Sequence, residues 1–280
     1  MESLGILAAL GAALAWGTYA VPFKISKSEN LVQFQALTGV GIFLSGLIIS
    51  KVAGYSLNLN SYGLLSGVLW GIANAIFLTA LSNLGISRAV PVVSSLVIIS
   101  SFLWGVLVFN ELPTSAVTGF LGIGAIILGV ILVSTTENTQ SQNIKKGLLA
   151  AVLSGLIFGS QLVPLKFGHV ATTDFFFSTT IGIFLTGLII FLVKKVGFKN
   201  EAVAMSILSG IIWNVGNLLS LISISLIGLA KAIPTTQSSS LIAVLWGIFY
   251  FKEITQPRHR LQVLVGATIL LIGVIMLGMA

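Results

Sequence analysis

The sequence predicts an all-α polytopic membrane protein of ten transmembrane helices, built as two five-helix inverted repeats. Three observations predict this fold class: a very apolar composition, ten apolar runs long enough to cross a bilayer, and a duplication of the sequence at an offset of about 142 residues. The composition indicates the solvent, the apolar runs give the helices, and the duplication indicates how the helices are arranged.

The composition is that of a chain surrounded by lipid. Hydrophobic residues make up 56% of the 280 residues, charged residues make up 8%, and the mean hydropathy is +1.08. Because soluble domains carry about 25% charged residues, we expect lipid to cover most of the surface. The net charge of +7 does not indicate a nucleic-acid partner, since Lys and Arg fall in short loops between apolar runs. With no Cys and only two His, we expect neither a metal centre nor another cofactor.

Ten apolar runs approach the roughly 20 residues that a helix needs to cross the hydrocarbon core of a bilayer. Polar or charged segments separate them, and the longest such segment, Glu137–Gln142, joins two halves of five spans each. We therefore divide the chain into a first repeat (1–136), a connecting loop (137–146) and a second repeat (147–280). The predicted spans are 3–23, 32–50, 62–83, 88–109, 116–134, 147–166, 175–193, 203–226, 231–251 and 261–279.

The duplication extends through both halves, with small differences in loop length. Because each half has an odd number of spans, the second half enters the membrane in the opposite sense. Inverted repeats of this kind are typical of transporters that open a central site to each side in turn. The clearest repeated segments are Val21-Pro22-Phe23-Lys24 with Val163-Pro164-Leu165-Lys166, Trp70-Gly71-Ile72-Ala73-Asn74 with Trp213-Asn214-Val215-Gly216-Asn217, and Trp104-Gly105 with Trp246-Gly247.

The Lys and Arg residues predict the orientation, because cytoplasmic loops of membrane proteins are enriched in them. With the N-terminus outside, the outer loops hold only Lys51, Lys166 and Lys231. Both termini are therefore predicted to be extracytoplasmic, in the plasma membrane. The inner loops then hold Lys24, Lys27, Arg88, Lys145, Lys146, Lys194, Lys195, Lys199, Lys252, Arg258 and Arg260.

The third and eighth spans place a Trp and an Asn four residues apart, as Trp70 with Asn74 and Trp213 with Asn217, so each pair shares one helix face. An Asn amide in hydrocarbon needs a polar partner, and a Trp ring offers a flat apolar platform. Together they suit a sugar, which has hydroxyl groups and an apolar C–H face. The alternative is that Asn joins helices and Trp marks the membrane interface. The predicted substrate-binding residues are Trp16, Tyr19, Trp70, Asn74, Gln161, Trp213, Asn214, Asn217 and Gln237.

The first and sixth spans each end in a Pro followed by a Lys, as Pro22 with Lys24 and Pro164 with Lys166. A Pro inside a helix removes a backbone hydrogen bond and kinks the helix, and the freed carbonyl must then face a cavity or another helix. Matched kinks in both halves predict a paired gate that involves these four residues. Equally, the prolines could end their helices and the lysines reach toward the interface.

Small residues at four-residue spacing, Gly67 with Gly71 and Gly155 with Gly159, predict close approach of neighbouring helices.

The seven carboxylates all lie at span ends or in loops, so none is predicted at the membrane midplane, where proton-coupled carriers commonly keep one. If transport is coupled to protons, the titrating group either lies at a span end or is one of the repeat lysines with a lowered pKa, and uniport or exchange is equally open. We expect Glu111 and Glu253 to be structural turn residues that pair with neighbouring cations. Arg88 and Lys231 precede the fourth and ninth spans and are either gate cations or interfacial anchors, of which we favour anchors.

The whole chain resembles the drug/metabolite transporter superfamily, through its two five-span halves and the repeated link Trp104-Gly105…Glu111-Leu112 and Trp246-Gly247…Glu253-Ile254. Within it, the chain looks most like the glucose/ribose porter family of glucose uptake proteins. That likeness is carried by Trp16-Gly17…Val21-Pro22…Lys24, Ser66-Gly67…Trp70…Asn74 and Ser223-Ile224-Ser225…Pro234. The resemblance implies inward transport of a sugar through the plasma membrane, often with proton symport.

Other functions stay open at this stage. A drug/metabolite-type exporter of amphipathic compounds or amino-acid-like metabolites would favour a larger and more apolar cavity with fewer amides. A membrane scaffold or sensor would need an output domain, and an enzyme would need a convergent set of His, Cys or carboxylates. We therefore expect a monosaccharide carrier and no enzyme. The sequence does not fix the sugar, the coupling ion or the oligomeric state.

Overall fold

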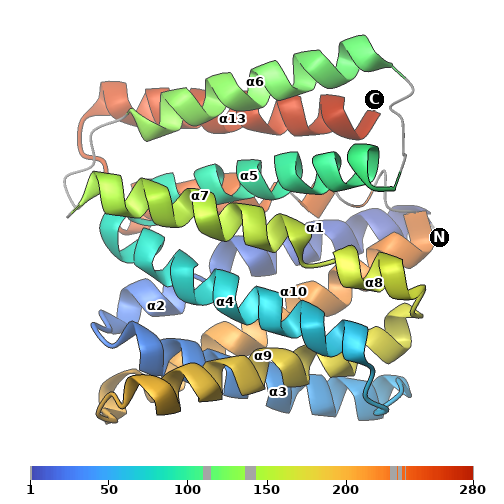
Figure 1. Cartoon of the computed structure of the whole chain (residues 1–280). Helices are drawn as coiled ribbons and strands as arrows, with labels where there is room; N and C mark the ends of the chain where they lie inside the picture. Colours follow the sequence, from blue (N-terminus) through green and yellow to red (C-terminus); the bar gives the residue numbers. More distant parts are fainter. Residues whose placement is uncertain are drawn as a thin grey trace.

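The computed structural model describes residues 2–109, 115–135, 143–227, 232, 235–236 and 238–279, and among these it contains helices and no β-strand (Figure 1). In this described part of the chain, seven helical segments are long and apolar enough to cross a membrane, and two shorter apolar helices cover Val117–Val133 and Ser239–Tyr250. The chain is therefore a helical, multi-pass membrane protein.

Several helices follow the predicted spans closely, whereas the start of the span predicted at 231–251 lies largely outside the described residues. The spans predicted at 32–50, 62–83 and 203–226 are found as α3, α4 and α10, within three residues at each end. In chain order, the described helices are α1 (Glu2–Thr18), α2 (Val21–Ser26), α3 (Leu31–Ala53), α4 (Ser61–Leu84), α5 (Ile86–Leu107), α6 (Ala116–Ser134), α7 (Ile144–Ser160), α8 (Val163–Gly168), α9 (Thr172–Lys194), η1 (Asn200–Ala202), α10 (Val203–Ile227), α12 (Ser239–Leu245), η2 (Trp246–Tyr250) and α13 (Pro257–Met279).

Asparagine side chains define where several of these helices begin. Asn30 accepts from the backbone N–H of Gln33 (3.0 Å) at the start of α3, and Asn60 accepts from that of Gly63 (2.6 Å) at the start of α4. Such caps satisfy N–H groups that have no partner within the helix. Gly54 ends α3 with a φ of +68°, a conformation that glycine adopts without strain.

The first and sixth spans are each broken into two helices rather than kinked. α1 stops at Thr18 and α2 restarts at Val21, and α7 stops at Ser160 with α8 restarting at Val163. Pro22 and Pro164 lie in the first turns of α2 and α8. The prolines therefore neither kink a continuous helix nor end one, the two alternatives of the sequence; each lies in a first turn, which needs no N–H from a proline and accepts its fixed φ.

Glycines let the helices cross closely, as the spacing predicted. A Cβ atom on Gly67 of α4 would lie 2.7 Å from Gly182 Cα of α9, and one on Gly159 of α7 would lie 2.5 Å from the carbonyl oxygen of Val97 in α5. Figure 1 shows the consequence: α4 lies against α9 and α7, while α6 and α13 form a separate pair at one side.

Gly67→Ala is expected to lower the free energy of unfolding by about 1–3 kcal/mol, because the new methyl group meets backbone that cannot rotate away. Gly124→Ala in α6 is the matched control. A Cβ atom there meets nothing within 4 Å, so the better helix propensity of Ala should leave stability unchanged or slightly raised. Thermal unfolding of the detergent-purified protein measures both. Equal midpoints for the two variants would contradict the close crossing.

Candidate functional site

Aromatic rings from four helices meet at the centre of the bundle. The ring centroids of Trp70 (α4) and Trp213 (α10) are 4.4 Å apart, and both residues are buried. Phe158 of α7 lies 5.9 Å from Trp70, and Trp16 of α1 donates from its indole N–H to the carbonyl of Trp213 (3.2 Å). Trp16, Tyr19 and Phe158 are only half-buried, so the edge of this aromatic cluster is accessible.

Asn74 lies one helical turn after Trp70 and is held by Gln35 of α3. Gln35 donates to the carbonyl of Gly71 (3.2 Å), so its Oε1 is turned toward Asn74 and accepts from Asn74 Nδ2 (2.6 Å). This order of donors fixes the Asn74 amide with its carbonyl oxygen on the other side. That oxygen is buried and has no hydrogen-bond partner among the described residues.

Asn214, next to Trp213 in α10, is held in a similar way. Its Nδ2 donates to the carbonyl of Ile42 (3.3 Å) and to Ser45 Oγ (3.0 Å), both on α3. Its Oδ1 is likewise buried without a partner in the described part of the chain. Both amide NH₂ groups thus join helices, as one interpretation of the sequence required. Both carbonyl oxygens keep unused acceptor capacity, which is costly when buried.

The other predicted residues that the structure describes are half-buried. Asn217 is half-buried one turn after Trp213, and Gln161 is half-buried in the break between α7 and α8. Tyr19 stacks on Phe77, with ring centroids 5.9 Å apart. Gln237 lies outside the described residues.

Two tryptophans that the sequence analysis did not assign hold the ends of the broken helices. Trp246 donates from its indole N–H to Thr18 Oγ1 (3.2 Å), and Trp104 donates to Ser160 Oγ (2.8 Å). Thr18 and Ser160 are the last residues of α1 and α7. The repetition of Trp-Gly in both halves was the signal that could have identified these residues. Gln35 was also missed, although a glutamine inside an apolar run is a comparable signal.

Glu253 lies in the loop between η2 and α13 and contacts the start of α5. Its carboxylate is fully buried and accepts from the backbone N–H groups of Ile86 (2.8 Å) and Ser87 (2.8 Å) and from Ser87 Oγ (2.6 Å). Lys24 of α2 lies 3.1 Å from its Oε1. A Cβ atom on Gly85 would lie 2.6 Å from this carboxyl group, so the approach requires glycine there. The expected pairing of Glu253 with a cation is confirmed, whereas Glu111 lies outside the described residues.

The other predicted gate and anchor residues differ in their surroundings. Lys166 is exposed, with its ammonium 4.4 Å from the ring centroid of Phe109. Arg88 is only 1% exposed, so the expectation of an interfacial anchor is wrong for this residue. The reason is that the Gly85 turn places the first turn of α5 inside the bundle, where Glu253 contacts it. Lys231 lies outside the described residues.

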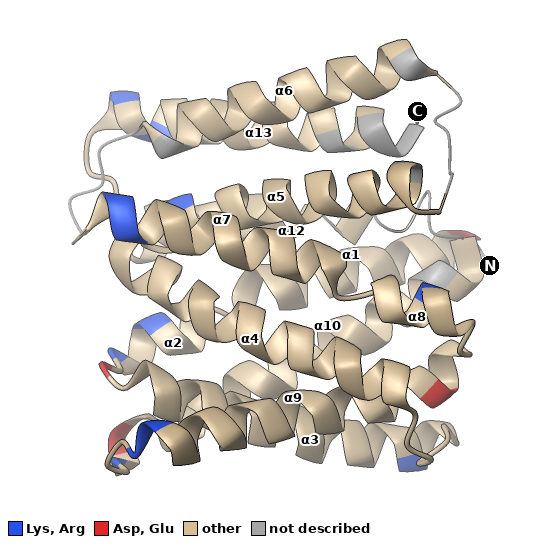
Figure 2. Cartoon of the chain, viewed as in Figure 1, with Lys and Arg blue, Asp and Glu red and all other residues tan. Residues whose placement is uncertain are grey.

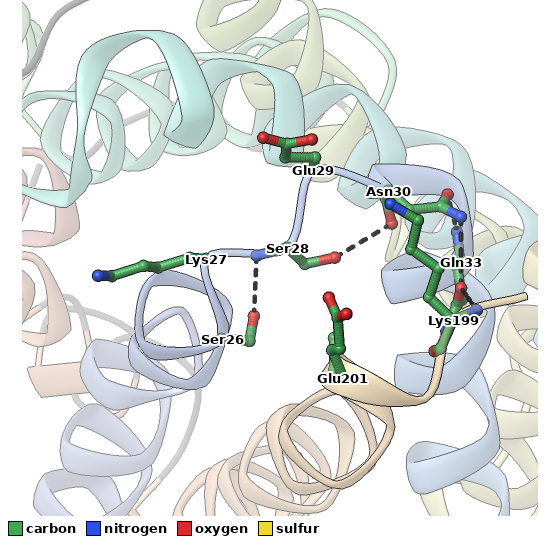
Figure 3. A pocket seen from close by; sticks show the side chains of 9 residues that line it. Ser26, Lys27, Ser28, Glu29, Asn30, Gln33, Lys199 and Glu201 are labelled. Carbon is green, nitrogen blue, oxygen red and sulfur yellow. Dashed lines mark hydrogen bonds between the residues drawn. The ribbon is translucent and has the colours of Figure 1, made fainter.

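A polar pocket of about 240 Å³ lies between the α2–α3 loop and η1. Gln33 accepts from the backbone N–H of Lys199 (2.8 Å), and Asn30 donates to the carbonyl of Gly197 (3.0 Å). Figure 3 shows the Glu201 carboxylate directed toward the α2–α3 loop, while Lys27 extends away. These hydrogen bonds connect the start of α3 to the segment before α10. The pocket therefore lies beside a structural contact between these two segments.

Comparison with known proteins extends over almost the whole chain. The GlcU protein of Bacillus subtilis (strain 168), a glucose uptake protein, is 27% identical over 286 residues that cover 99% of each chain. A solved crystal structure superposes with a TM-score of 0.59 at 16% identity, covering 96% of each chain, and this likeness concerns the fold alone. The profile of the family described as Sugar transport protein matches residues 7–280. The resemblance to glucose uptake proteins is thereby confirmed, and this chain belongs to the Sugar transport protein family.

Proposed function

We propose that the protein is a facilitative or secondary-active carrier that takes up a glucose-like monosaccharide across the plasma membrane by alternating access. One observation carries this proposal: two buried amides, Asn74 and Asn214, each keep an unpartnered carbonyl oxygen beside a partly accessible aromatic cluster. Sugar hydroxyl groups would donate to these oxygens, while the C–H face of the sugar would stack on a ring. The family and the relative named for glucose uptake support a carrier of a sugar rather than an enzyme.

Trp70 and Trp213 contact each other in this state, so we place the sugar beside this pair. The half-buried rings of Trp16 and Tyr19 pack against the cluster, and we propose that the half-buried amides of Asn217 and Gln161 line the same site. The proposed site keeps Gln237 as a further lining residue on sequence grounds.

We further propose ten spans in two inverted repeats, with boundaries at 1–136, 137–146 and 147–280. Equivalent contacts support this arrangement. α1 packs on α10 as α7 packs on α4, and α3 packs on α10 as α9 packs on α4. The indole bonds from Trp246 to Thr18 and from Trp104 to Ser160 join equivalent positions. α2 and α8 also end alike, at Lys27 (φ 48°) and His169 (φ 46°).

The broken spans are proposed as paired gates, one at each end of the bundle. Pro22 and Lys24 would serve one end, and Pro164 and Lys166 the other. The contact between Lys24 and Glu253 (3.1 Å) supports the first gate, because it ties α2 from the first half to a loop of the second half.

The proposed orientation places both termini outside the cell. Figure 2 shows Lys and Arg gathered mainly at one end of the bundle, and both termini lie at the other end. A green fluorescent protein fused after residue 140 should therefore fluoresce, because that loop is proposed to be cytoplasmic. An alkaline phosphatase fused at the same position should be inactive. An active phosphatase fusion together with a non-fluorescent green fluorescent protein fusion would show that the orientation is the opposite one.

The direct test is uptake of radiolabelled glucose by the purified protein in liposomes, with unlabelled sugars as competitors. Saturable uptake that other monosaccharides inhibit would support the carrier. Repeating the assay with an inward-directed proton gradient tests coupling, and acceleration would direct attention to span-end carboxylates such as Glu253. No uptake by folded protein would favour an exporter of amphipathic or amino-acid-like compounds instead.

A further inference from the structure

The two broken spans occupy equivalent positions in the repeat, yet their breaks have different surroundings. In the first break, the carbonyl of Tyr19 accepts from Ser209 Oγ of α10 (2.6 Å), and the next residue, Ala20, is 3% exposed. The equivalents in the second break are Gln161 and Leu162, each 142 positions later in the sequence. Leu162 is 45% exposed. The first break is therefore docked into the bundle, whereas the second is open to its surroundings.

Ser66 of α4 is the equivalent of Ser209, 143 positions earlier. It is fully buried, and its hydroxyl has no hydrogen-bond partner among the described residues. Tyr62, one turn before Ser66, contacts Gly168 of α8. Residues four apart share one helix face, so Ser66 is on the face of α4 that α8 packs against. A buried hydroxyl without a partner is unfavourable, so a role in another conformation would explain why the site holds a serine.

We propose that Ser209 and Ser66 are alternative docks for the two helix breaks. In the described state, Ser209 holds the Tyr19 carbonyl and the break between α1 and α2 is closed. In the opposite state, the Ser66 hydroxyl donates a hydrogen bond to the carbonyl of Gln161. The hydrogen bond from Ser209 to the Tyr19 carbonyl is then broken. This exchange rests on the alternating access of the proposed function. Ser209 would stabilise one conformation of the carrier and Ser66 the opposite one.

The charged contact beside the first break agrees with this assignment. Lys24 lies four residues after Ala20 and forms an ion pair with the buried Glu253. The end that Ser209 closes is therefore also held by an ion pair between the two halves. Opening this end must break both contacts. Forming a hydrogen bond from Ser66 at the other end would offset part of that loss.

The sequence makes a clean accessibility test possible, because it contains no Cys. Ala20→Cys introduces a single thiol at a position that is buried while the first break is docked. The rate at which N-ethylmaleimide modifies this thiol in the full chain, purified in detergent, reports how often the break opens. No ligand is needed for this measurement.

On this background, Ser209→Ala should raise the labelling rate about two- to tenfold, the equilibrium shift that one net hydrogen bond provides. Ser66→Ala should lower the rate by a similar factor, because it removes a bond made only in the opposite state. The double variant should return close to the starting rate, since the two effects oppose each other. Ser206→Ala is the matched control: Ser206 is buried in α10, but its hydroxyl donates to the carbonyl of Ala202 (2.7 Å) in the preceding turn, η1, and not to either break, so its loss should leave the rate unchanged.

Changes of the same sign in both single variants, or no change in either, would overturn the exchange. Glucose uptake by the same variants in liposomes separates this inference from the proposed function. Opposite labelling shifts without sugar uptake would keep the exchange and reject the substrate. Sugar uptake with labelling that ignores both serines would reject the exchange alone.

Discussion

Glu253→Ala is expected to lower the free energy of unfolding by about 3–5 kcal/mol, the cost of removing one partner from a buried ion pair. The carboxylate is fully buried and accepts hydrogen bonds from the backbone N–H groups of Ile86 and Ser87 and from the Ser87 hydroxyl. It also forms an ion pair with the Lys24 ammonium. Alanine would leave these donors facing a void. A large fall in the thermal unfolding midpoint of the detergent-purified protein measures the effect.

Three further variants show whether the carboxylate itself is responsible. Glu253→Gln keeps one acceptor oxygen and should be intermediate. Lys24→Ala should be milder than Glu253→Ala, because the α5 donors remain on the carboxylate and the Lys24 side chain is 22% exposed. Glu201→Ala is the control, since Glu201 is an exposed carboxylate beside the polar pocket. Equal midpoints for Glu253→Ala and Glu201→Ala would contradict this account.

The positions of the long helices could be predicted from the sequence because their causes are local. An apolar run of bilayer length, started by an asparagine cap such as Asn60 and ended by a glycine such as Gly54, carries its own boundaries. The close crossing at Gly67 was predictable for the same reason, since small residues at four-residue spacing mark a face that another backbone can approach.

The breaks and the buried charges could not be predicted, because their causes are distant in the sequence. Whether Pro22 kinks a helix or begins a new one depends on how the preceding turn is held, and Ser209 provides that contact from 190 positions away. Glu253 reads as an ordinary loop carboxylate until the start of α5, 166 positions earlier, is packed against it. Gln35 likewise gains its meaning from Asn74 on another helix.

Asn74→Ala is expected to reduce glucose uptake to about a tenth of the wild-type rate or less while membrane expression persists. The variant removes the unpartnered carbonyl oxygen that is proposed to accept from a sugar hydroxyl, and it also leaves Gln35 Oε1 without its donor. Asn83→Ala is the matched control on the same helix, because Asn83 is buried but donates within α4, to the carbonyl of Thr79 (2.8 Å). Asn83→Ala should transport normally.

A second comparison separates sugar binding from the joining of helices. Losing the donor to Gln35 should by itself lower stability by about 1–3 kcal/mol, whereas replacing both partners with apolar residues of similar shape is nearly neutral. The double variant Gln35→Leu, Asn74→Leu should therefore recover the thermal midpoint that Asn74→Ala loses, yet remain inactive in uptake. If the double variant instead recovers both stability and uptake, Asn74 acts only between helices. The acceptor for the sugar must then be sought at Asn214, whose carbonyl oxygen is also buried without a partner among the described residues.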